Sequence, residues 1–134
     1  MKALQFSRTG DLSALRQLDL PTPLPAAGEV LVEVRASGLN PSDVKNVLGR
    51  FPYTTLPRIP GRDFAGVVVQ GPPSLLDKAV WGTGKELGFY NDGTHAGLVI
   101  GAGAVGRAAL ARVRGAHVLG AARGTAAGSA GPGV

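Results

Sequence analysis

The feature that most constrains this chain is the stretch GTHAGLVIGAGAVG, residues 93–106. Its first five residues predict a turn and strand that close a β-rich region. Its last six, GAGAVG, have the G-x-G-x-x-G spacing that follows the first strand of a dinucleotide-binding unit. Only residues 97–100 separate the two signals. We therefore expect one domain to end and another to begin with almost no linker.

Length and composition narrow the possible number of domains and the possible classes of protein. A chain of 134 residues accommodates one ordinary domain and is too short for two complete ones. Hydrophobic residues at 44% and charged residues at 17% are typical of a globular protein. The absence of cysteine excludes disulfides and thiolate zinc sites. With no signal-like apolar run and no membrane-length segment, we expect a cytoplasmic protein with no membrane partner.

The positive charge is concentrated at the C-terminal end. Residues 1–92 carry ten Lys or Arg and nine Asp or Glu, whereas residues 93–134 carry four Arg and no acid. A basic excess attracts polyanions. The basic region has no aromatic platform and no dense basic run, which argues against nucleic acid. A nucleotide phosphate is the better candidate partner.

Residues 1–97 predict a β-rich first domain. A short helix is expected to begin at a cap residue, Ser42 or Asp43, and to run through Leu48 before Gly49. Prolines near residues 21–25 and in the segment 51–61 predict irregular connections. Short strands with one small helix favour a β-barrel-like domain. The expected strands are residues 1–6, 15–20, 29–36, 64–69 and 78–81.

The composition changes from Leu98 onward, where 20 of the 34 residues after Ile100 are Gly or Ala. Residues 98–123 predict one βαβ unit, in which a buried strand leads through the glycine turn into a helix over 104–114 and a second strand over 116–121. Residues 124–134 have almost nothing to bury and predict a disordered tail.

The glycine spacing predicts a cofactor site. Gly101 permits a tight turn, Gly103 lets the backbone approach a pyrophosphate, and Gly106, after Val105, lets the helix pack on the strand. The helix N-terminus adds amide donors and a partial positive charge. Arg123 ends the second expected strand, where a cation can meet the 2′-phosphate of NADP. A solvated arginine before a tail explains Arg123 equally well.

Two further segments, GLNPSD (38–43) and PRIPGRDFAGVVV (57–69), resemble a known family. They are similar to the N-terminal chaperonin-10-like (GroES-like) domain of medium-chain dehydrogenases/reductases, in the zinc-independent, quinone-oxidoreductase-like branch. The resemblance implies a β-rich barrel of the alcohol-dehydrogenase N-terminal type, followed by a single βαβ unit of an incomplete Rossmann fold. In zinc-using relatives a Cys stands at the position of Asn40, and a His-Glu pair at Arg62-Asp63. The resemblance therefore implies no zinc. It implies NADPH or NADH as the cofactor if the chain is active, and NADPH is favoured if Arg123 meets a 2′-phosphate.

The resemblance also implies roles for three side chains. In the zinc-free branch the residue at Asn40 lines the nicotinamide and substrate cleft, and an amide can orient a carbonyl without titrating. Phe51 and Tyr53 lie in a loop where relatives often carry a Tyr, so we expect them in the substrate pocket. On the residues alone, Asn40-Pro41 predicts only a turn before a capped helix.

The remaining titratable candidates have weaker signals. Asp63 is expected to support the site or, more simply, to pair with Arg62 or Arg58. His95 and His117 have no partner at ligand or triad spacing, so we expect His95 only to decorate the strand after Gly93.

Three hypotheses about function remain open. In the family that the chain resembles, several dozen residues lie between the regions that correspond to 1–97 and 98–123, and a longer cofactor domain follows. The hypotheses differ in what a chain without these parts can do. The first hypothesis is a truncated, impaired NADPH-dependent reductase of small carbonyls or quinones. The second is a non-catalytic remnant with a vestigial nucleotide unit. The third is an interaction protein that pairs its open sheet edge with itself, as a homodimer, or with a full-length relative.

Overall fold

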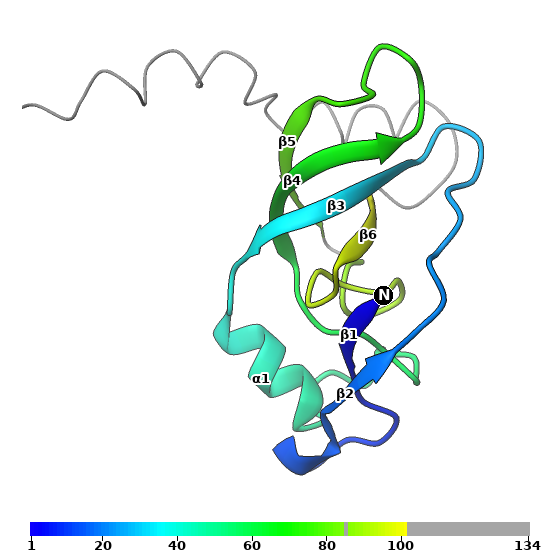
Figure 1. The fold of residues 1–134 in the computed structure, drawn as a ribbon. Coiled ribbons are helices and arrows are strands. Elements are labelled where there is room, and N and C mark those ends of the chain that lie inside the picture. Colours follow the sequence, from blue (N-terminus) through cyan, green and yellow to red (C-terminus); the bar gives the residue numbers. More distant parts are fainter. Residues whose placement is uncertain (85, 102–134) are drawn as a thin grey trace, which may run out of the picture.

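The computed structural model describes residues 1–84 and 86–101. Figure 1 shows a mainly β architecture with one small helix, and this expectation is confirmed. Each of the five strands expected in residues 1–97 occurs within two residues of its predicted bounds. The elements are β1 (Lys2–Gln5), the one-turn 3-10 helix η1 (Leu12–Ala14), β2 (Arg16–Asp19), β3 (Val30–Ser37), α1 (Pro41–Val47), β4 (Asp63–Gln70), β5 (Ala79–Thr83) and β6 (Leu98–Gly101).

The strands form two antiparallel sheets. A four-stranded sheet has the order β5-β4-β3-β6, and β1 pairs with β2 in a second sheet. Along β4, buried and half-buried residues alternate, as the two-residue period of a strand requires. The buried side of the larger sheet forms the main core, which consists of Val30, Val32, Phe64, Val68, Val80, Leu87 and Val99.

The position of β6 differs from the expectation for residues 98–101. We expected this segment to open a parallel βαβ unit, but it pairs antiparallel with β3, with Val99 opposite Val32 and Gly101 opposite Val30. The reason is burial, because this pairing places Val99, which is 2% exposed, in the core of the first domain. The helix expected at 104–114, the strand at 116–121 and the tail at 124–134 lie outside the described residues.

Helix α1 covers a second, smaller core made of Phe6, Ala14 and Val47. Its N-cap residue is Asn40, so the caps expected at Ser42 or Asp43 are wrong. Pro41 explains the shift, since its fixed φ and missing N–H favour the first position of a helix. Within the described residues, no helix has the length and apolar character needed to span a membrane.

Candidate functional site

The most connected polar residue at the expected site is Asn40, which lies between β3 and α1. Its Nδ2 donates to Asp63 Oδ2 at 2.6 Å, and its backbone N–H donates to Asp43 Oδ2 at 2.8 Å. Asp43 is in the first turn of α1, where a carboxylate favours the N-terminal dipole, and Asp63 opens β4. The fold thus joins three segments at one residue, Asn40, through its side chain and its backbone N–H. The local sequence around Asn40 predicted only a turn.

Asp63 is an ionised acceptor at the ends of β4 and β5. The Thr83 hydroxyl lowers the pKa of Asp63 most, and the amide of Asn40 and the charge of Arg62 lower it further, while burial raises it. The expected pairing with Arg58 is wrong, because Arg58 Nη1 lies 3.0 Å from Asp92 Oδ1. Arg62 contributes to the lowered pKa of Asp63 through its positive charge and not through a hydrogen bond.

A groove of about 460 Å³ runs beside this cluster. Its polar wall includes Ser37, Asp63 and Thr83, and its apolar wall includes Trp81. Thr83 is a residue that the sequence analysis missed, and no local pattern could have identified it, since only the pairing of β4 with β5 brings it opposite Asp63. The carboxylate of Asp63 and the hydroxyls of Ser37 and Thr83 can orient a ligand in this groove by hydrogen bonds.

His95 does more than decorate a strand. Its Nε2 lies 3.2 Å from the Gly38 carbonyl and 3.6 Å from Asp43 Oδ2. Gly61 makes this approach possible, because a Cβ at Gly61 would lie 2.2 Å from His95 Cδ2. His95 therefore contacts the carboxylate that also accepts from Asn40, and the expectation of an isolated histidine is wrong.

Phe51 and Tyr53, the expected pocket residues, belong to an aromatic cluster with Phe89 and Tyr90. The Phe51 and Phe89 rings pack edge to face at 5.2 Å, and Tyr53 and Tyr90 stack at 5.9 Å between centroids. Arg62 Cζ lies 5.1 Å from the Phe89 centroid. The two tyrosines are about half exposed, at 45% and 53%, so the cluster presents aromatic surface to solvent.

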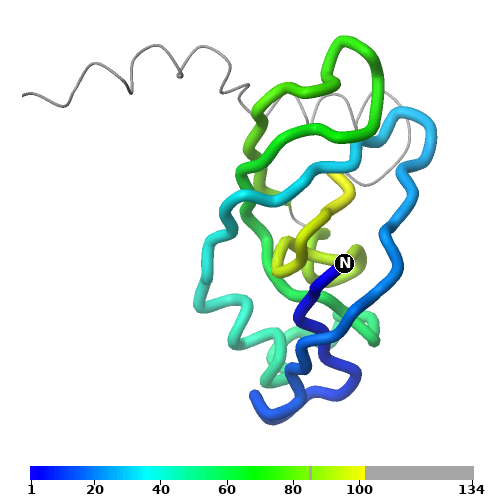
Figure 2. The backbone as a smooth tube through the Cα atoms, in the orientation of Figure 1, coloured from blue at the N-terminus to red at the C-terminus, as the bar shows by residue number. Residues whose placement is uncertain are grey.

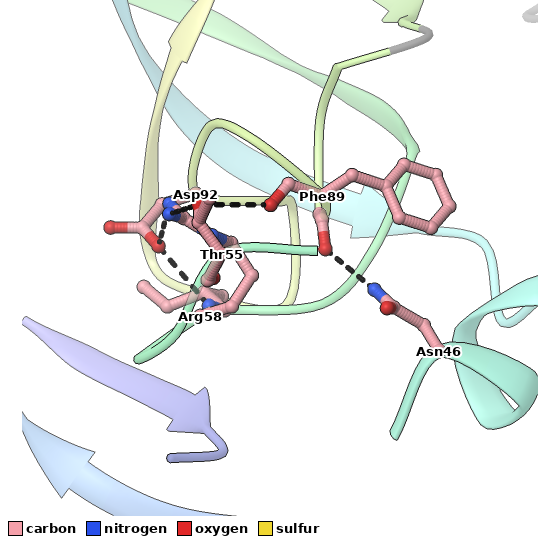
Figure 3. A network of polar contacts seen from close by, with 7 residues as sticks. Asn46, Thr55, Arg58, Phe89 and Asp92 are labelled. Atoms are coloured by element: carbon pink, nitrogen blue, oxygen red, sulfur yellow. Dashed lines mark hydrogen bonds and ion pairs between the residues drawn. The ribbon is translucent and has the colours of Figure 1, made fainter. Parts of the chain in front are cut away.

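A polar network fixes the loop that carries Phe89 (Figure 3). Asn46 Nδ2 donates to the Gly88 carbonyl at 2.6 Å, and Asn46 is only 2% exposed. The backbone N–H of Thr55 donates to the Phe89 carbonyl at 3.0 Å, and Arg58 pairs with Asp92 nearby. The network links α1 to both aromatic loops, and its Asn46–Gly88 hydrogen bond is buried.

Of the expected cofactor residues, the structure describes only Gly101. It lies in β6, where a Cβ would come within 2.6 Å of Val30 Cγ2. Packing against β3 thus explains this glycine without a nucleotide. Gly103, Val105, Gly106 and Arg123 lie outside the described residues.

In residues 1–84 and 86–101, antiparallel sheets and the helix α1 surround the Asn40–Asp63 contact, as expected for a GroES-like domain. The profile of the alcohol dehydrogenase GroES-like domain matches residues 26–117, which is more than half of the chain. The chain therefore belongs to this family, and the resemblance noted from the sequence is confirmed. The match extends past residue 97, in agreement with the place of β6 in the first-domain sheet.

Curated relatives belong to the same superfamily. The chain is 53% identical over 78 residues to a zinc-type alcohol dehydrogenase-like protein of Schizosaccharomyces pombe, covering 58% of this chain and 24% of that protein. It is 40% identical over 80 residues to an NADPH-dependent alkenal/one oxidoreductase of Arabidopsis thaliana, covering 58% and 21%. The chain thus matches about a quarter or less of each relative's length.

Solved structures agree with the fold. A quinone oxidoreductase from Coxiella burnetii is 28% identical with a TM-score of 0.66, over 75% of this chain and 34% of that chain. A mycobacterial protein solved in complex with NADPH is 28% identical with a TM-score of 0.64, over 75% and 29%.

Two of the three residues at the family's zinc-ligand positions, Asn40 and Arg62, do not fit a zinc ion, whereas the third, Asp63, is a carboxylate. Asn40 offers an amide N–H₂ that donates to Asp63, and Arg62 is a cation, whereas zinc prefers thiolate, imidazole and carboxylate ligands. In residues 1–84 and 86–101, no three His, Cys, Asp or Glu side chains form a group that could hold a metal ion.

Proposed function

We propose that this chain carries the substrate-binding part of an NADPH-dependent, zinc-independent reductase of small quinones, enones or carbonyls. The relatives in this superfamily are oxidoreductases, and one is named as an NADPH-dependent alkenal/one oxidoreductase. The observation that carries the proposal is the Asn40–Asp63 hydrogen bond of 2.6 Å beside the groove. It places a non-titrating amide at the position where zinc-using relatives have a metal ligand.

The proposed division of roles follows from the chemistry of each residue. Asn40 orients the substrate, Phe51 and Tyr53 contact its planar apolar part, and Asp63 fixes the amide through a charge-assisted hydrogen bond. When bound, NADPH supplies the hydride. We propose that Gly103, Val105, Gly106 and Arg123, which follow β6, hold its phosphates.

The test is NADPH consumption by the purified chain with crotonaldehyde and with 1,4-benzoquinone. We expect turnover above the protein-free rate, a loss of about tenfold or more on Asn40→Ala, and no change after dialysis against a metal chelator. Gln17→Ala, which removes an exposed amide on β2, is the control. The proposal fails if the chain does not consume NADPH, or if Asn40→Ala and Gln17→Ala have the same rate.

A second candidate is a non-catalytic interaction module, favoured by the outer edge of β6. Among the described strands, only β3 pairs with β6. The segment LVIG has neither the charges nor the prolines that usually protect an edge strand. Figure 2 shows the connector from β2 to β3 running past β6, and a pocket of about 510 Å³ lined by Leu20, Pro21, Leu98 and Ile100 adjoins the strand. The occupant that we propose is the β6 edge of a second copy.

Light scattering across a concentration series tests this candidate. We expect a dimer that Ile100→Lys dissociates, because a charge blocks edge pairing. Val69→Lys, on the exposed side of β4, is the matched control and should leave the dimer intact. A monomer at every concentration would exclude the second candidate.

A further inference from the structure

Arg62 is a half-buried cation whose hydrogen-bonding capacity is almost unused. Its Nε is buried and has no partner within the described residues. Its Nη2 reaches only the Gly84 carbonyl, at a long 3.4 Å. Its guanidinium lies over the Phe89 ring. Because a guanidinium does not deprotonate in proteins, the buried Nε–H is left without an acceptor, and Nη2 has only the long Gly84 contact.

The chain offers no further side-chain acid for Arg62. All nine Asp and Glu residues lie at or before residue 92, in the part of the chain that the structure describes, and residues 93–134 contain none. Ion pairs between described residues join Lys2 to Asp19, Arg35 to Glu33, Arg58 to Asp92 and His95 to Asp43. Arg62 is in none of them. Its neighbour Asp63 accepts from Thr83 and Asn40 instead.

Arg62 contacts one half of the candidate site and adjoins the other half in the sequence. On one side it precedes Asp63, which lines the groove together with Thr83. On the other it packs on Phe89, which contacts Phe51 and Tyr53. A planar ligand that lies against the aromatic cluster therefore meets, at Phe89, a guanidinium that forms no ion pair with a described acid.

We propose that Arg62 binds the carbonyl oxygen of the substrate and stabilises the negative charge that this oxygen gains on reduction. This inference rests on the proposed function. For an enal, hydride adds to the β-carbon, the C=C electron pair moves through the α-carbon to the carbonyl oxygen, and water then returns a proton to the α-carbon. Arg62 donates N–H bonds to the oxygen while it is an enolate, in place of the Lewis acid that a metal would provide.

The first experiment measures anion binding without turnover. Crotonate has the planar shape of crotonaldehyde and carries a full negative charge, so its binding to the complete chain, followed by NMR, probes Arg62 directly. We expect saturable binding that weakens about tenfold or more in Arg62→Gln and less in Arg62→Lys, which keeps a point charge. Arg16→Gln, on exposed β2, is the control and should bind as the unmodified chain does.

The proposed anion site would be overturned if crotonate does not bind to the chain. It would also be overturned if Arg62→Gln and Arg16→Gln bind crotonate equally well. Far-ultraviolet circular dichroism checks that the variants fold. Should Arg62→Gln fail to fold, Arg62→Lys decides the question, because unchanged crotonate affinity in the lysine variant contradicts bidentate guanidinium binding.

The second experiment separates the substrate oxygen from a cofactor phosphate. If Arg62 acts on the substrate, Arg62→Gln lowers kcat for crotonaldehyde by about tenfold or more while the Kd for NADPH stays unchanged. A raised Kd for NADPH with unchanged kcat would assign the anion site to the cofactor and overturn the proposal. If the unmodified chain consumes no NADPH, the proposed function and the catalytic role fail together, and the crotonate result alone then decides whether Arg62 is an anion site.

Discussion

Replacing Asn40 with aspartate puts a second carboxylate beside Asp63 and changes little else. Asparagine and aspartate have nearly the same size and are equally good N-cap residues, so α1 should keep its start. In the native chain, the Asn40 amide donates to Asp63 over 2.6 Å. In Asn40→Asp, the donor becomes a like charge at a similar distance. The substitution therefore tests this one contact.

The expected cost follows from Coulomb's law. Two unit charges about 3 Å apart repel by about 5 kcal/mol at an effective dielectric constant of about 20. Asn40 and Asp63 are only half-buried, so solvent screens part of this repulsion. Retained repulsion and the lost hydrogen bond together should lower the free energy of unfolding at neutral pH by about 3 kcal/mol.

The pH dependence provides the sharper test. In the native chain the pKa of Asp63 is lowered, so its stabilisation is present above the unfolded value of 3.8 and is lost as the pH falls through the folded pKa. In Asn40→Asp, repulsion raises the pKa of one carboxyl of the pair, and stability should fall as the pH rises above the unfolded pKa. The difference in stability between the two proteins should therefore grow from about pH 3 to about pH 7.

Urea unfolding at several pH values, followed by the fluorescence of Trp81, measures this difference, since Trp81 is the single tryptophan of the chain. Asn40→Ala is the companion variant. It loses the hydrogen bond but adds no charge, so it should be destabilised with little of the extra pH dependence. A constant difference between native chain and Asn40→Asp from acid to neutral pH would show that the side chains do not meet and would refute the reasoning.

Three further substitutions test the structure around the site by chemical denaturation. Gly66→Ala should lower the free energy of unfolding by about 3 kcal/mol or prevent folding, because the new Cβ would lie 2.1 Å from the Glu33 carbonyl oxygen; near-native stability would contradict the β3–β4 register. Asn46→Ala should cost about 2–3 kcal/mol, since the Gly88 carbonyl loses its donor, and near-ultraviolet circular dichroism should report looser aromatic loops. Val68→Ala, at a fully buried position, should cost about 2 kcal/mol, and a cost near zero would place β4 outside the core.

Local patterns predicted most strands, the helix and the turns of the first domain. The alternation of buried and half-buried residues along β4 and the proline at the start of α1 are properties of neighbouring residues, so they appear in the sequence. The family resemblance named Asn40, although its role as N-cap residue became clear only when Asp43 and Asp63 were located. Phe51 and Tyr53 were expected at the substrate pocket, but their packing with Phe89 and Tyr90 depends on contacts between distant loops.

The sequence by itself determined that the chain is β-rich, that it resembles the GroES-like domain family, and that no acidic side chain follows residue 92. Tertiary structure decided the rest. It assigned β6 to the first-domain sheet, because burying Val99 against β3 outweighs a motif that is defined by spacing alone. It brought Thr83 near Asp63 and His95 near Asp43, since strand pairing joins positions with no shared local pattern. It also left Arg62 without an acidic partner, a property that depends on where all nine acids of the chain lie in space.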